Sequence, residues 1–118
     1  MKGYQIDGWK VPAFTTFHGL MERSIAMNGK EPFHLSEMIK KNLHKIDLST
    51  PLNFVSTHDI TGGNSGSPVI STSGKLIGLI FDGNAYSHSG NYIYTDEKSR
   101  SVSVHSRAIL EALKNIYN

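Results

Sequence analysis

The pattern of apolar and polar residues changes character near residue 48. In residues 34–46, apolar side chains recur three and four positions apart, which is the spacing of one buried helical stripe. Ser36 stands where a helix N-cap is expected, and three lysines lie off the stripe or near the C-terminal end, where the helix dipole favours cations. We therefore predict a packed amphipathic helix over residues 34–46. Its stripe consists of Leu35, Met38, Ile39, Leu43 and Ile46.

The segment before this helix is predicted to form short elements. Residues 1–9 contain glycines between apolar positions and indicate a short strand with a turn. Residues 11–17 indicate a second strand, which Pro12 would confine to a sheet edge or a late start. Residues 20–26 favour a helical turn.

Beyond residue 48, short apolar runs alternate with turn residues, which is typical of β-strands. Residues 67–71 and 75–81 flank the turn signal at 72–74 and predict a buried hairpin. The sequence at 82–84 is predicted to end the second strand of that hairpin. Further strands are predicted at 52–57, at 91–95 and at 101–105, the last with Val102 and Val104 on one face.

A final helix is predicted from Ser106, which can serve as its N-cap. Its inner stripe consists of Ile109, Ala112, Leu113 and Ile116. The pattern as a whole predicts a mainly β chain with an amphipathic helix before the strands and a helix at the end. We divide the single unit into residues 1–47, 48–105 and 106–118.

Length and composition narrow the possible functions. The chain has 118 residues, which suffices for one small domain, and a formal net charge of +2 with no basic block, so nucleic acid and membrane surfaces are not predicted partners. No run of about 18 apolar residues predicts a membrane span, and residues 1–10 lack the apolar centre of a signal peptide. Cysteine is absent and the histidines are scattered, so we predict neither a disulfide nor a metal site, and no cofactor.

The glycine-rich stretch at residues 61–69 carries the candidate chemistry. Ser65 lies among glycines that permit positive φ and remove the Cβ atoms that would block a substrate. Consecutive backbone N–H groups in such a turn can converge on a developing oxyanion. The simpler alternative is a flexible loop, but two strongly apolar strands flank the stretch. We therefore interpret Ser65 as a nucleophile.

The run at residues 63–68 resembles the nucleophile turn of trypsin-like serine peptidases. In that fold a β-hairpin follows the turn and a helix ends the chain, and both are predicted here in the same order. The resemblance implies that Ser65 Oγ attacks the scissile carbonyl and that the N–H groups of Gly63 and Ser65 bind the oxyanion.

A narrower resemblance follows from residues 53–61, 78–84 and 14–22. Together with the turn they resemble the bacterial serine dipeptidyl peptidases of types 7 and 11, and the likeness extends from about Gly3 to the last helix. The family has a trypsin-like double β-barrel with an added helical domain and removes dipeptides from peptide N-termini. The resemblance implies that this chain is a C-terminal portion carrying an incomplete second barrel, from a periplasmic or secreted enzyme acting on oligopeptides.

The same resemblance implies substrate-binding roles for residues 82–84. Asp82 matches the acidic residue that helps to hold the substrate's α-amino group, a cation that needs a charge-assisted partner once desolvated. Gly83 matches the position that sets the primary specificity pocket, where glycine favours an apolar P1 residue and acidic-specific relatives carry arginine. Asn84 is grouped with them as substrate-binding.

Several positions depart from the family pattern. His58 stands where asparagine is expected, His105 where aspartate is expected, and the pair at 85–86 replaces an aromatic-acidic pair. None of the six histidines lies in a segment resembling the family's catalytic histidine motif, and without a base a serine is a poor nucleophile. His58 is the one histidine close enough in sequence to Ser65 to merit a test. We expect the chain alone to be inactive and to need the missing first barrel or a homodimer partner.

Two other functions remain open at this point. Glutamyl endopeptidases carry a run like that at residues 61–69, although the sequence at 81–84 lacks the cation that a glutamate pocket needs. The other alternative is a non-catalytic peptide-binding or interaction module derived from a peptidase.

Overall fold

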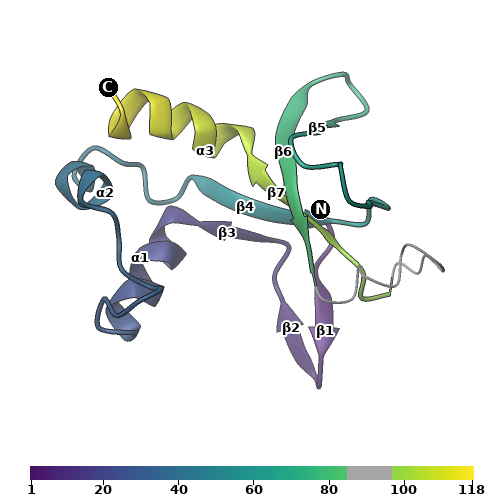
Figure 1. Ribbon diagram of the computed structural model, residues 1–118, viewed down its shortest axis with the longest axis horizontal. Helices are drawn as coiled ribbons and strands as arrows, with labels where there is room; N and C mark the ends of the chain where they lie inside the picture. The colour runs from purple at the N-terminus through teal and green to yellow at the C-terminus, as the bar shows by residue number, and fades with distance from the viewer. Residues whose placement is uncertain (85–96) are drawn as a thin grey trace.

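A computed structural model of the chain describes residues 1–84 and 97–118. Its main feature is a five-stranded antiparallel sheet in the order β3-β4-β7-β6-β5, with a separate β1–β2 hairpin below it (Figure 1). The strands are β1 Tyr4–Ile6, β2 Trp9–Val11, β3 Phe14–Thr16, β4 Pro51–Ser56, β5 Pro68–Ile70, β6 Leu76–Gly83 and β7 Ser101–His105. The helices are α1 Phe17–Ala26, α2 Glu37–Asn42, α3 Ser106–Glu111 and the π-helical turn η2 Ala112–Ile116.

The mainly β prediction is confirmed, and the sheet in the described part of the chain ends at β3 and β5 and does not close into a barrel. The predicted strand at 91–95 and the pair at 85–86 lie outside the described residues. None of the helices in the described ranges is long and apolar enough to cross a membrane.

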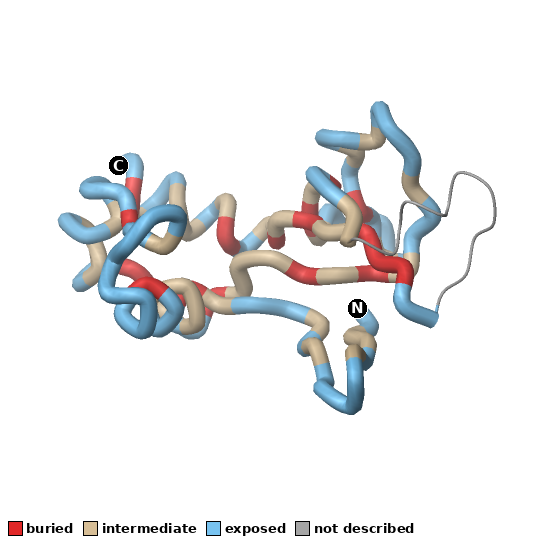
Figure 2. Tube along the Cα trace, turned by 60° about the horizontal axis from the view of Figure 1, so that its bottom comes forward, coloured by how far each residue is buried: buried red, intermediate tan, exposed pale blue. Residues whose placement is uncertain are grey.

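In the described part of the chain, two apolar clusters pack against the sheet, one on the helical side and one beside the 61–67 turn. Figure 2 shows buried residues both among the helices and along the sheet. The first cluster joins helices α1, α3 and η2 to the sheet and consists of Phe17, Ile46, Ala108 and Ile116, with Val104 packed against it. The second consists of Phe54, Val69 and Ile80, with Ile60 and Ile77 packed against it.

Strand β7 lies at the centre of the sheet and is covered on both faces. The predicted alternation is present, because Val102 and Val104 are half-buried while Ser101, Ser103 and His105 are at most 7% exposed. Val104 packs against the helical cluster, and Ser103 lies between its sheet partners Phe54 and Ile80. The polar face of this strand is therefore the more deeply buried one.

The helix predicted over residues 34–46 is shorter than expected. Helix α2 spans Glu37–Asn42, and residues 43–46 form turns. The Asn42 side chain donates to the carbonyls of Met38 (2.9 Å) and Ile116 (3.3 Å), which ties the helix end to η2. Met38 is 48% exposed, so the predicted stripe is not buried along its length. The predicted N-cap is confirmed, because Ser36 Oγ accepts from the N–H of Ile39 (3.3 Å).

The strand predicted over residues 11–17 is also shorter. Thr16 caps helix α1 by accepting a hydrogen bond from the N–H of Gly19 (3.2 Å), so the helix begins at Phe17 rather than at Leu20. Because an N-cap residue has extended backbone, Thr16 serves both as the last residue of β3 and as the start signal of α1.

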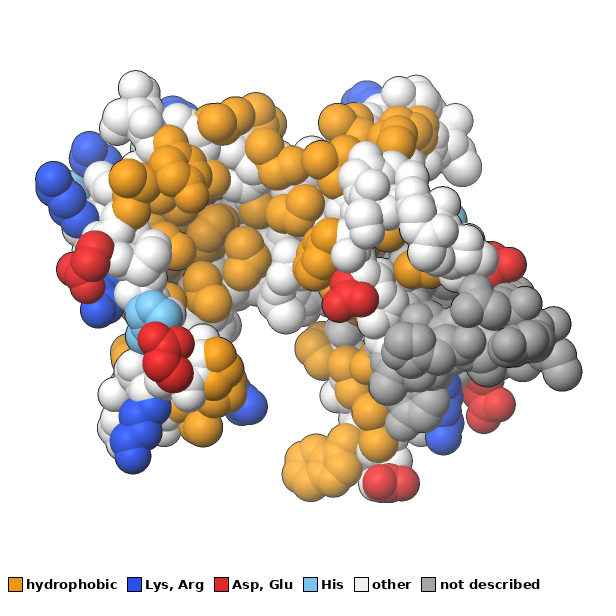
Figure 3. All heavy atoms as spheres, in the orientation of Figure 1, with side chains coloured by type: hydrophobic (Ala, Val, Ile, Leu, Met, Phe, Trp, Pro, Cys, Tyr) orange, Lys and Arg blue, Asp and Glu red, His pale blue; other side chains and the backbone are white. Residues whose placement is uncertain are grey.

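The predicted hairpin forms, but β6 does not end at Asp82. The strand continues to Gly83 because Asp82 pairs with Val102 and Gly83 with Ser101, after a bulge between Ile80 and Asp82. The expectation of a buried hairpin is wrong for several of its apolar side chains. Ile70, Leu76 and Phe81 are 51%, 49% and 47% exposed. Figure 3 shows apolar side chains gathered over the face that carries α3 and the sheet.

The N-cap of the final helix lies one residue earlier than the sequence predicts. His105, not Ser106, is the N-cap, because its Nδ1 accepts a hydrogen bond from the N–H of Arg107 (3.1 Å). The His105 ring also packs edge-on against Phe54, with centroids 5.6 Å apart. Burial, and to a lesser extent the nearby Arg107 charge, lower the pKa of His105. Only a deprotonated Nδ1 can accept the capping bond, so the fold requires the neutral ring.

We predict that His105 makes folding stability fall in mild acid. Its folded-state pKa lies below the ordinary value of 6.5, so its stability contribution is present above that value and is lost as pH decreases, when the unfolded chain binds the proton first. His105→Asn keeps a capping oxygen that does not titrate. Thermal unfolding followed by circular dichroism from pH 7.5 to 5.5 should show a smaller loss of Tm in His105→Asn than in the wild type. His44→Asn, at an exposed histidine, is the control; equal losses in all three proteins would contradict the capping account.

Candidate functional site

The turn that carries Ser65 is held by its own backbone and by Asn64. The Asn64 side-chain oxygen accepts from the N–H of Thr61 (2.7 Å), and the Asn64 carbonyl accepts from the N–H of Ser67 (2.9 Å). Gly63 and Gly66 have φ values of 99° and 87°, a region that strongly favours glycine. These constraints leave Ser65 exposed at the front of the turn.

Two main-chain bonds fasten this turn to strand β6. The N–H of Gly66 donates to the Ile80 carbonyl (2.7 Å), and the N–H of Ile80 donates to the Ser67 carbonyl (2.9 Å). A Cβ built on Gly63 would meet no atom within 4 Å, so the space beside its backbone is open. The arrangement gives an exposed hydroxyl beside an unobstructed stretch of backbone, as nucleophilic attack with oxyanion stabilisation requires.

The end of β6 carries the other predicted site residues. Asp82 is exposed, and its Oδ1 accepts from the N–H of Gly83 (2.8 Å). Asn84 clamps the end of the strand to the segment before β7. Its side chain donates to the Lys98 carbonyl (2.8 Å) and accepts from the N–H of Arg100 (3.1 Å). The Asn84 amide thus holds neighbouring backbone in place, and direct contact of Asn84 with a substrate stays a prediction.

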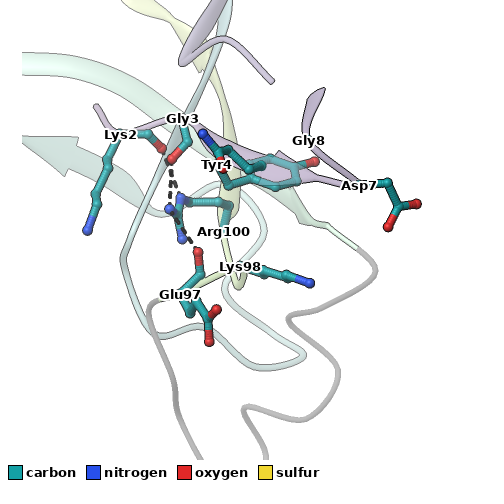
Figure 4. A pocket seen from close by; sticks show the side chains of 9 residues that line it. Lys2, Gly3, Tyr4, Asp7, Gly8, Glu97, Lys98 and Arg100 are labelled. Atoms are coloured by element: carbon teal, nitrogen blue, oxygen red, sulfur yellow. Dashed lines mark hydrogen bonds between the residues drawn. The ribbon is translucent and has the colours of Figure 1, made fainter. Parts of the chain in front are cut away.

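The sequence analysis did not identify Arg100 as a structural or functional residue. Its guanidinium donates to the carbonyls of Lys2 (2.9 Å) and Gly3 (2.8 Å) and lies over the Tyr4 ring at 5.6 Å, while the residue is only 1% exposed. Figure 4 shows these groups around a cavity of about 430 Å³. These two acceptors are main-chain carbonyls, which the residue types in the sequence do not reveal. Arg100 joins the β1–β2 hairpin to the end of β6 through its bonds with Asn84.

A row of hydroxyl groups crosses the sheet beside Gly83. Ser56 on β4 lies opposite Ser101 on β7, and Ser101 lies opposite Gly83 on β6. Ser56 Oγ lies 2.7 Å from Ser101 Oγ and 2.7 Å from His58 Nδ1. Alternating serines in a strand are normally a solvent-facing pattern, so sequence reasoning gave no signal for this row.

His58, which the sequence analysis singled out for its closeness to Ser65 along the chain, is hydrogen-bonded to Ser56. Within residues 1–84 and 97–118, no hydrogen bond joins the Ser65 hydroxyl to an imidazole. His88 lies outside the described residues. The other described histidines are His18 beside Glu22 (3.6 Å), His34 beside Glu31 (2.9 Å), the exposed His44 and the capping His105. Within those ranges there is also no group of three or more metal-ligating His, Asp or Glu side chains.

A second cavity of about 530 Å³ lies between β3, α1 and β4. Apolar surface dominates its lining, to which Phe14, Leu20 and Leu52 contribute. It lies among elements that carry none of the residues predicted to bind substrate.

The sequence and the fold were compared with known proteins. The family model of peptidase S46 matches residues 1–118. Dipeptidyl-peptidase 7 of Phocaeicola vulgatus is 39% identical over 110 residues, covering 88% of this chain and 15% of the relative. The Asp/Glu-specific dipeptidyl-peptidase of Porphyromonas endodontalis is 37% identical over 117 residues, covering 93% of this chain and 16% of the relative.

The solved structures that resemble this chain include those of the dipeptidyl peptidase DPP11. Porphyromonas endodontalis DPP11 in an alternate conformation aligns with a TM-score of 0.82 and 31% identity, covering 99% of this chain and 19% of that one. DPP11 in complex with the dipeptide Arg-Asp aligns with a TM-score of 0.80 and 32% identity, covering 96% and 17%. The chain therefore spans less than a fifth of the relatives and structures that it matches.

Proposed function

The chain belongs to the peptidase S46 family, and from that premise we propose that it is the serine-bearing part of a dipeptidyl peptidase that releases dipeptides from the N-termini of peptides. The observation that carries the proposal is the pair of main-chain bonds between the Ser65 turn and Ile80 on β6. They connect an exposed serine to the strand that ends in Asp82 and Gly83. A trypsin-like fold and a periplasmic or secreted location are parts of the same proposal, and both rest on the family resemblance.

The proposed reaction is acyl transfer to Ser65 followed by hydrolysis. Ser65 Oγ attacks the scissile carbonyl carbon and passes its proton to a general base, while the N–H groups of Gly63 and Ser65 stabilise the oxyanion. The peptide C–N bond breaks as the leaving amine takes up a proton. Water then cleaves the dipeptidyl ester and frees the serine. We propose that the general base belongs to the part of the family's length that this chain does not span.

Asp82 supplies the proposed reason for dipeptide release. An exposed carboxylate at the end of β6 can bind a substrate ammonium group through charge-assisted hydrogen bonds. A fixed distance between this carboxylate and Ser65 would allow two residues between the substrate's N-terminus and the scissile bond. Endopeptidases have no such requirement, so Asp82 favours dipeptidyl peptidase activity over a glutamyl endopeptidase.

Gly83 supports a preference for apolar residues at P1, because it adds neither charge nor bulk. The names of the relatives point in two directions, since they include both dipeptidyl-peptidase 7 and Asp/Glu-specific enzymes. The preference therefore rests on Gly83 itself.

A non-catalytic peptide-binding module is the second candidate. The observation in its favour is that no imidazole bonds to Ser65 among the described residues. Such a module would bind peptides through Asp82 and Gly83 without turnover in any context.

We predict no release of coumarin from dipeptidyl substrates by the 118-residue chain alone. A chimera in which this chain replaces the matched stretch of the Phocaeicola vulgatus relative should restore turnover. Ser65→Ala in the chimera should lower kcat by a factor on the order of 10⁶, as loss of a serine nucleophile does, while Ser71→Ala, in the β5–β6 turn region, should not. A folded chimera that binds peptides but never turns them over would instead support the binding module.

We predict that Gly83→Arg in the same chimera reverses the P1 preference. A guanidinium at this position would pair with an acidic P1 side chain and reject an apolar one by burying an unpaired charge. The ratio of kcat/KM for P1 Glu over P1 Leu should rise by a factor on the order of 100. An unchanged ratio would show that residue 83 does not face the P1 side chain.

A further inference from the structure

We infer that Arg100 is a positioning residue of the proposed dipeptide site: its main chain and its guanidinium together hold the end of β6 where the Asp82 carboxylate can bind a substrate ammonium group. This inference rests on the proposed function and deepens it. Arg100 is only 1% exposed, so it acts through its neighbours and does not contact the peptide itself.

Arg100 continues the β6–β7 pairing directly beyond the two proposed substrate-binding residues. Asp82 and Gly83 pair with the first two residues of β7. The next pair is Asn84 with Arg100, in which the N–H of Asn84 donates to the Arg100 carbonyl (3.0 Å). The end of β6 therefore follows the position of the Arg100 main chain.

The Asn84 side chain completes this pair. In a regular antiparallel pair the N–H of Arg100 would donate to a main-chain carbonyl, but here it donates to Asn84 Oδ1 (3.1 Å). The Asn84 amide nitrogen donates in turn to the Lys98 carbonyl (2.8 Å). Asparagine offers a donor and an acceptor in one short side chain, so it fixes the strand end to two points of the segment before β7.

The Asp82 carboxylate is oriented by the backbone that this pair holds. Its Oδ1 accepts from the N–H of Gly83 (2.8 Å). Gly83 lies between Asp82 and Asn84 in the chain, so a displacement of Asn84 moves the N–H that orients the carboxylate. Because charge-assisted hydrogen bonds depend on distance and direction, such a movement weakens the binding of an ammonium group.

The guanidinium fixes Arg100 from its other side. It donates to the carbonyls of Lys2 (2.9 Å), Gly3 (2.8 Å) and Ser99 (2.7 Å), and Figure 4 shows it directed at this N-terminal segment. A planar group with donors in a fixed fork can hold several carbonyls at once, which a lysine ammonium cannot reproduce. A buried cation also resists movement away from its acceptors, because an unpaired charge in the interior is unfavourable.

The far end of this connection is a glycine with no room for a side chain. A Cβ built on Gly3 would collide with the carbonyl oxygen of Val11. Gly3→Ala must therefore displace the main chain whose carbonyl accepts from Arg100, although residue 3 lies outside the candidate site. The simpler role for Arg100 is to stabilise the β1–β2 hairpin without any effect on peptide binding.

The test is isothermal titration of the 118-residue chain with alanyl-leucine. Arg100→Lys keeps the charge but loses the fork, and it should weaken binding on the order of tenfold, the usual size of coupling within one hydrogen-bond network. Gly3→Ala should also weaken binding. Gly29→Ala, which strains the turn after α1 where φ is 64°, is the matched control. It should bind alanyl-leucine like the wild type even though its Tm falls.

A double-mutant cycle shows whether Arg100 acts through Asp82. Asp82→Asn alone should weaken alanyl-leucine binding. In that background Arg100→Lys should change the affinity by less than about twofold, because the group that Arg100 positions has lost its charge. The same cycle with Gly3→Ala provides the answer if Arg100→Lys does not fold, which circular dichroism shows.

The outcomes separate the two proposals. If Arg100→Lys is folded and keeps the wild-type affinity, or if the losses from Arg100→Lys and Asp82→Asn multiply, the positioning role is overturned while the dipeptide site stands. If the wild type does not bind alanyl-leucine, or if Asp82→Asn leaves its affinity unchanged, the proposed function fails and the positioning role fails with it.

Discussion

Two hydrogen bonds between the backbone at residues 66–67 and Ile80 are the constraint on which the candidate site depends. They attach the glycine-rich turn to β6, the strand that ends in Asp82 and Gly83. Strand β6 is held in turn by its long antiparallel pairing with β7. A shift in either contact would separate the exposed serine from the residues proposed to bind substrate. The bulge between Ile80 and Asp82 shifts the register of β6 against β7, so that Gly83 lies opposite Ser101.

The central strand β7 and the residue before it carry buried polar groups. Arg100, Ser101, Ser103 and His105 are each at most 7% exposed. Carbonyls, hydroxyls and a helix N-terminus provide partners for three of them, but Ser103 Oγ has no hydrogen-bond partner among the described residues. An unsatisfied buried hydroxyl costs about 1–3 kcal/mol. Small apolar residues at these positions would avoid that cost.

Sequence reasoning succeeded where one residue type has one structural consequence. Glycines around Ser65 predicted a turn, Ser36 predicted a cap, and apolar alternation predicted the strands. It failed where a partner distant in sequence determines the local structure. Asp82-Gly83 is a common turn signal, but pairing with β7 keeps it in a strand. His105 is an unusual cap, and no local pattern reveals the carbonyls that surround Arg100. The roles proposed for residues 82–84 came from family resemblance and not from periodicity.

The central claim is that the Ser65 turn and the end of β6 form one dipeptide-binding site. Amide chemical shifts of the ¹⁵N-labelled chain, recorded during titration with alanyl-leucine, test it most directly. The account predicts that the largest changes occur together at residues 63–67 and 82–84, with one common affinity. Changes concentrated instead around Phe14, Leu20 and Leu52, in the apolar cavity between β3, α1 and β4, would contradict it.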